Sequence, residues 1–65
     1  MSKDFIFLCE IAVGMVAVRY SEISHMETLG TGATKVYLSL GIPLIVEESQ
    51  AQILNLIQLN ENLKE

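Results

Sequence analysis

Residues 34–57, TKVYLSLGIPLIVEESQAQILNLI, contain the change from a strand-like to a helix-like pattern. Over residues 34–40, apolar and polar side chains alternate, which is the period of a half-buried strand, so we expect Val36, Leu38 and Leu40 to face the core. Ser49 and Gln52 then match a capping box, in which the serine hydroxyl and the glutamine side chain satisfy free amides at a helix start. Apolar residues recur beyond it at helical spacing, so we expect a helix from about residue 50 to residue 63.

The residues before this stretch predict more strands. Apolar, β-branched runs bounded by turn residues lie at 4–13, 15–20 and 24–29, and another at 42–46 follows Gly41. The sequence Gly30-Thr31-Gly32 reads as a hairpin loop between two of these strands. The predicted fold class is α+β: a small antiparallel β-meander of four to five strands followed by one C-terminal α-helix, in a single domain of residues 1–65.

The composition points to self-association. The chain has 65 residues, of which 51% are hydrophobic and only 18% are charged. So small a domain buries a modest core, and one cysteine and one histidine exclude an internal disulfide and a zinc ligand cluster. Exposed apolar patches commonly mark interfaces, so we expect a homo-oligomer.

Two features predict where copies meet. Both faces of the first strand are apolar near its start, although a single covering helix would bury only one of them. The helix carries a second apolar stripe, about 100° from the stripe formed by Ile53, Leu54 and Ile57. The predicted oligomer interface is therefore Leu56, Leu59, Leu63, Phe5 and Phe7.

Charge and hydropathy limit the classes of partner and the cellular compartment that we expect for this chain. The net charge is −4 and the four basic residues are scattered, which makes nucleic-acid binding unfavourable. No run of about 18 apolar residues predicts a membrane span, and the first residues lack the pattern of a secretory signal. A lone cysteine suits a reducing compartment, so the expected location is the cytoplasm.

The chemistry-bearing residues do not suggest an enzyme. Cys9 alternates with apolar residues and is expected to be a small buried hydrophobe, while His25 lies in a polar stretch without a recognisable acidic partner. Glu47 and Glu48 are adjacent and are interpreted as solvated charges near the helix start. No catalytic residue, cofactor site or metal site is predicted.

A ligand or partner contact is the remaining hypothesis for the polar side chains. Arginine and lysine beside aromatic rings suit anionic or stacking ligands, and two copies could bring such groups together. The alternative is that they are ordinary surface residues. The candidates are Arg19, Tyr20, Lys35, Tyr37 and the loop residue Thr31.

Residues 16–57 resemble the small family of flagellar and swarming-motility regulators. The resemblance lies in Ala17-Val18, Ile23, residues 34–38, Gly41, residues 46–49 and residues 53–57. Residues 21–27 are also similar to the turn-and-strand region of half of a LytTR DNA-binding domain, although this chain is acidic where that domain is basic. The resemblance implies a fold of short strands followed by one helix, and a function as a regulatory binding protein. It does not imply DNA binding.

Two functional hypotheses follow. The first is a non-enzymatic, oligomeric regulatory or adaptor protein that acts by protein–protein interaction. The alternative is a small phage-type anti-defence protein that inhibits a host protein or sequesters an anionic nucleotide signal between protomers.

Overall fold

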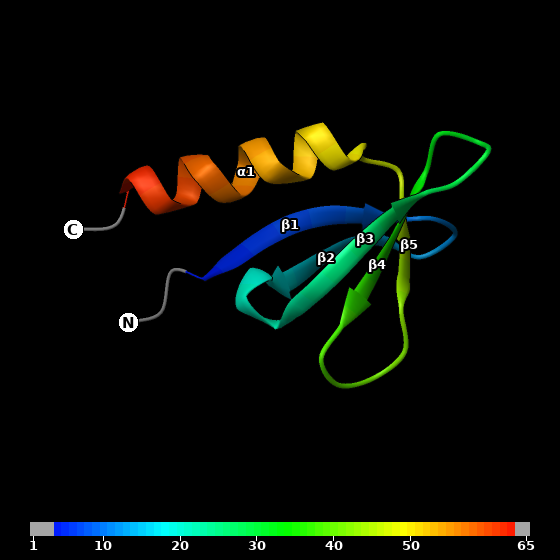
Figure 1. Cartoon of the computed structure of the whole chain (residues 1–65), viewed down its shortest axis with the longest axis horizontal. Coiled ribbons are helices and arrows are strands. Elements are labelled where there is room, and N and C mark those ends of the chain that lie inside the picture. Colours follow the sequence, from blue (N-terminus) through cyan, green and yellow to red (C-terminus); the bar gives the residue numbers. More distant parts are fainter. Residues whose placement is uncertain (1–3, 64–65) are drawn as a thin grey trace.

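The computed structural model describes residues 4–63, which form a small α+β fold (Figure 1). Its elements are β1 (Phe5–Glu10), β2 (Gly14–Arg19), the 3₁₀ turn η1 (Tyr20–Glu22), β3 (Ile23–Thr28), β4 (Thr34–Leu38), β5 (Leu44–Val46) and α1 (Gln50–Leu63). The five strands make one antiparallel sheet in the order β2-β1-β5-β4-β3. The predicted α+β class, with an antiparallel sheet before a C-terminal helix, is confirmed.

The sheet consists of two parts that meet at one end. β1 and β2 form a hairpin, and β3, β4 and β5 form a meander whose last strand returns beside β1. The ladder between β1 and β5 has a single register pair, Glu10 with Val46, next to a hydrogen bond from the Ile11 N–H to the Ile45 carbonyl at 2.9 Å. Because the two strands separate beyond this point, α1 lies along the first half of β1 (Figure 1).

The core lies between these two parts and the helix. Branched apolar side chains from β1, β2, β4, β5 and α1 form it. The buried cluster consists of Ile6, Leu8, Val18, Val36, Val46 and Ile53.

The capping box is present at the start of α1. The Gln52 N–H donates to the Ser49 hydroxyl oxygen at 3.1 Å, and the Ser49 N–H donates to the Gln52 side-chain oxygen at 2.8 Å. These bonds satisfy amides that have no partner within the helix. The buried Thr34 hydroxyl donates to the Glu48 carbonyl at 2.7 Å, which fixes the helix start against β4.

The predicted hairpin loop around Gly30-Thr31-Gly32 is also confirmed. The Leu29 N–H donates to the Ala33 carbonyl at 2.8 Å, which closes the loop between β3 and β4. Gly32 has a φ of 94°, in the left-handed region where a side chain would be strained.

Four side chains differ from expectation. Cys9 is half-buried on the outer face of the sheet, because the core takes the alternate residues of β1. Leu40 is 80% exposed, since β4 ends at residue 38 and strand alternation does not continue into the loop. Leu54 is exposed because α1 buries one side only. Glu48 is not merely a solvated charge, since both its carboxylate oxygens lie 3.0 Å from the Cys9 amide nitrogen and accept its N–H.

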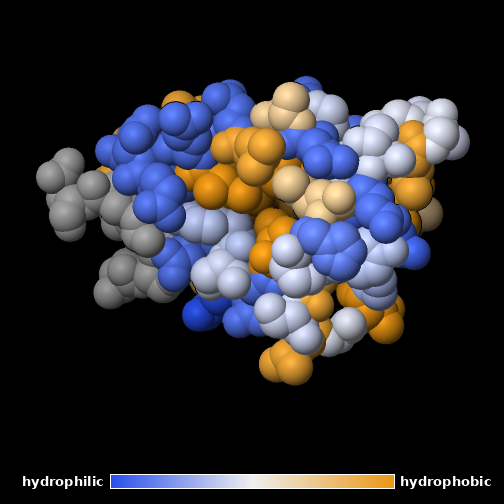
Figure 2. All heavy atoms as spheres, viewed as in Figure 1, coloured by the Kyte–Doolittle hydropathy of each residue, from blue (hydrophilic) through white to orange (hydrophobic). Residues whose placement is uncertain are grey.

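Figure 2 shows how apolar side chains reach the surface. The outer side of α1 is mostly hydrophilic on this face of the molecule, whereas hydrophobic atoms gather at the tip of the loop between β4 and β5. Leu40 and Ile42 are exposed in that loop. Beyond this loop, the larger apolar surface belongs to β1, β2 and the second half of α1.

Candidate functional site

An apolar groove runs between the first half of β1 and the second half of α1. We refer to it as the β1–α1 groove, and its volume is about 250 Å³. It is lined by Phe5, Ile6, Phe7, Leu56, Leu59, Asn60 and Leu63.

The groove exists because β5 does not reach this part of β1. The edge of β1 that faces α1 would otherwise leave backbone groups without partners, which is costly when they are shielded from water. The Asn60 side-chain N–H donates to the Phe5 carbonyl at 3.1 Å and holds the helix against this edge. The groove therefore rests on a strand and a helix, both of which are rigid supports.

The two walls of the groove are exposed hydrocarbon. Phe5 and Phe7 project from the outer face of β1, and Phe7 is 62% exposed. Leu59 and Leu63 project from α1, with Leu63 73% exposed, while half-buried Leu56 packs against the core.

Among residues 4–63, the side chains that line the β1–α1 groove are uncharged. The described lining can therefore remove apolar side chains from water. Its chemistry suits hydrophobic contact with another protein.

All five residues of the predicted oligomer interface line this one groove. The helix stripe and the first strand are separate features of the sequence, and the tertiary structure brings them together. Their role in assembly stays a prediction. Sequence reasoning missed Ile6 and Asn60; the signal for Asn60 was its position four residues after Leu56, on the same side of the helix.

The five predicted contact residues do not form one site within a protomer. Arg19 lies in β2, with its guanidinium carbon 5.0 Å from the centre of the Phe5 ring. Lys35 and Tyr37 lie in β4, and β1 and β5 separate that strand from β2. Thr31 is in the β3–β4 loop, where its hydroxyl accepts the Ala33 N–H at 3.4 Å.

Tyr20 and Tyr37 have local partners. The Tyr20 hydroxyl donates to Glu61 at 2.6 Å, so this residue connects η1 to α1. The Tyr37 ring stacks on His25 with centroids 4.1 Å apart, and the Lys35 ammonium lies 5.2 Å from its centre. These contacts make an exposed polar and aromatic cluster on β3 and β4, distant in the sheet order from Arg19.

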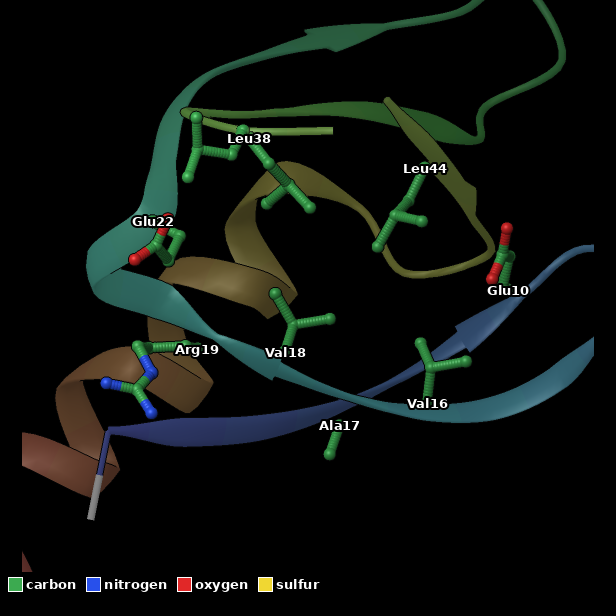
Figure 3. Close-up of a pocket in the computed structure, with 9 residues that line it drawn as sticks. Glu10, Val16, Ala17, Val18, Arg19, Glu22, Leu38 and Leu44 are labelled. Atoms are coloured by element: carbon green, nitrogen blue, oxygen red, sulfur yellow. The ribbon is translucent and has the colours of Figure 1, made fainter. Parts of the chain in front are cut away.

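A second pocket, with a volume of about 310 Å³, lies between β2 and the ends of β4 and β5. Val16 and Val18 point toward Leu38 and Leu44 across it, whereas Ala17 points to the opposite side of β2 (Figure 3). Glu10, Arg19 and Glu22 also line this pocket, and Lys35 and Tyr37 do not. We refer to it as the β2 pocket.

Cys9 and His25, the two candidate reactive side chains, do not lie together. Desolvation raises the pKa of the Cys9 thiol, and a hydrogen bond to Glu47 and the charges of Glu47 and Glu48 raise it further. A thiol in such surroundings stays protonated and is a poor nucleophile. His25 lies in β3, with β5 and β4 between it and the strand of Cys9. Across residues 4–63, no three acidic, histidine or cysteine side chains are grouped so that they could hold a metal ion.

Within the same described range, no helix is long and apolar enough to cross a membrane. Comparison with known proteins found no matching family model, no matching curated protein and no matching solved structure. The fold and groove define a small α+β domain with an exposed apolar groove, whose lining within residues 4–63 is uncharged.

Proposed function

We propose that this chain is a non-enzymatic regulatory or adaptor protein that self-associates and acts through contact with another protein. The observation that supports this function most strongly is the β1–α1 groove, because its walls are exposed hydrocarbon held on a rigid strand and helix. Exposed apolar surface of this kind is expensive in water and typically marks an interaction site.

The charge distribution favours a protein over an anion as the partner. Within residues 4–63 the groove lining is uncharged, and the polar side chain in it, Asn60, is bonded to the Phe5 carbonyl. A partner would insert apolar side chains between Phe7 and Leu63, with its polar groups left at the rim.

In-cell photo-crosslinking tests this function. A photoreactive phenylalanine analogue at Phe7 should give one discrete crosslinked species containing a second protein, and Leu63→Glu should remove it. The matched control places the same analogue at Leu40, which is more exposed but lies in the loop between β4 and β5.

The outcome separates the alternatives. If position 7 gives no discrete species, or the same species as position 40, the groove is not a partner surface. If the species contains only this chain, the groove joins two copies, and the adaptor function loses its support.

A further inference from the structure

The two edge strands of the sheet differ in how they are protected against strand pairing. β3 has a register irregularity between Ile23 and His25, and its exposed side chains include Glu27. Bulges and charges at an edge hinder the addition of another strand. β2 pairs with β1 in continuous register, and its single charged residue is Arg19 at the last position.

The ladder shows which backbone groups β2 presents. The Tyr20 N–H donates to the Asp4 carbonyl at 2.8 Å, and the register continues with Val18 opposite Ile6. Because hydrogen-bonded and non-hydrogen-bonded pairs alternate in an antiparallel ladder, the even-numbered residues of β2 bond to β1. Met15 and Ala17 therefore direct both their N–H and C=O groups away from the sheet.

The side chains along β2 are apolar on both faces. Val16 and Val18 face the inside, where the β2 pocket leaves space beside them (Figure 3). Met15 and Ala17 are exposed on the outer face, and Met15 is 68% exposed. A strand added at this edge would gain backbone hydrogen bonds and place apolar side chains beside both faces.

From this edge we propose that two copies of the chain associate by antiparallel pairing of β2 with β2, which joins their sheets into one continuous sheet. A two-fold axis perpendicular to the sheet brings the same strand of each copy together, so a single contact covers both unprotected edges. The remaining edges of the dimer are then the two bulged β3 strands.

Charge is compatible with a second copy at this edge. Each chain has a net charge of −4, so two copies repel each other in general. β2 contains a cation and no carboxylate, whereas the other edge strand contains Glu27. Of the two edge strands, β2 therefore carries the less negative charge.

This pairing rests on the self-association in the proposed function and gives it an interface. It is separate from the proposed partner surface, because the β1–α1 groove lies on the opposite side of β1 from β2. The groove stays open for another protein in the paired form. The interface is a short strand pair, so we expect dissociation in roughly the micromolar range.

Sedimentation equilibrium of the full chain tests the pairing. The mass should rise with concentration from that of the 7.2 kDa chain to twice that value. Ala17→Lys and Ala17→Glu should each weaken association by about tenfold or more, since like charges would lie opposite each other or within about 8 Å on the diagonal. An equimolar mixture of these two variants should associate about as well as the original chain.

Two controls make the result decisive. Ser24→Lys adds the same charge to the β3 edge and should leave association unchanged. Under β2 pairing Leu59→Glu should also leave it unchanged, whereas the interface predicted from the sequence would be weakened by that substitution. A chain that stays at 7.2 kDa even at about 1 mM overturns the pairing. The pairing is also overturned if the mixture of Ala17→Lys and Ala17→Glu associates as weakly as either variant alone. It is overturned as well if Leu59→Glu dissociates the dimer and Ala17→Lys does not, a result that would assign self-association to the groove.

Discussion

The side-chain amide of Asn60 donates a hydrogen bond to the backbone carbonyl of Phe5 at 3.1 Å, across 55 positions of sequence. This bond joins the last turns of α1 to the first residue of β1. It satisfies a carbonyl on an edge of β1 that β5 does not reach, because the register pair between β1 and β5 lies at Glu10.

Removing this bond should destabilise the fold modestly. Asn60→Ala is expected to lower the free energy of unfolding by about 0.5–1.5 kcal/mol, because a backbone carbonyl loses its partner. Urea denaturation measures the effect. Asn55→Ala, an exposed asparagine on the same helix, controls for helix propensity and should be neutral or slightly stabilising. Equal effects of the two variants would contradict the anchoring role of Asn60.

The two hydrogen bonds of the capping box should stabilise the fold cooperatively. Ser49→Ala is expected to cost about 1 kcal/mol of stability, because the Gln52 N–H loses its acceptor. Gln52→Ala removes the return bond to the Ser49 N–H. Denaturation of both single variants and the double variant measures the coupling, and strictly additive effects would show that the two bonds are independent.

Shortening the buried side chain of α1 should lower the stability of the fold more than shortening an exposed one. Ile53→Val is expected to cost about 0.5–1.5 kcal/mol, since Ile53 is fully buried in the core cluster. Leu54→Val, on the exposed side of the same helix, should cost less. Thermal denaturation compares them. A larger loss at residue 54 than at residue 53 would mean that the helix packs through a different side.

The Cys9 thiol should be slow to alkylate at neutral pH. Its pKa is raised above the ordinary value of 9.0, so its reaction with iodoacetamide should reach half its maximal rate above that pH. Glu47→Gln should lower this midpoint, because it removes a neighbouring negative charge. Glu27→Gln on β3 is the control and should leave the midpoint unchanged.

The same shift has a consequence for stability. A group whose pKa is higher in the folded state favours folding below its unfolded pKa and loses that contribution as the pH rises through the folded value. The chain should therefore become less stable as the pH rises above 9.0, and Cys9→Ser should reduce this loss. A pH dependence identical in the two proteins would show that the thiol does not contribute.

The local features of this protein are readable from short segments. The helix at 50–63 follows from the capping box and the apolar spacing that succeeds it, and the β3–β4 hairpin follows from Gly30-Thr31-Gly32. Such signals involve residues within a few positions of each other, so they can be recognised without knowledge of the rest of the fold.

The ends of the strands and the exposed fractions of individual side chains were less predictable from the sequence. Alternation placed Leu40 inside, but the chain turns away after Leu38, and Gly41 adopts a φ of 92° in the loop. Cys9 shares its periodicity with Phe5 and Phe7, and the pattern alone does not say which face of a doubly apolar strand the core will occupy. That choice depends on which side receives the helix.

The amino-acid sequence was sufficient for the elements, the fold class and five of the six apolar residues of the groove, because these depend on local spacing and side-chain chemistry. Tertiary structure alone established that β5 returns beside β1, that the two strands separate after one register pair, and that α1 occupies the space between them. Pairing between distant strands depends on how the whole chain closes its core. For that reason the β1–α1 groove and the unprotected edge of β2 appear only once the chain has folded.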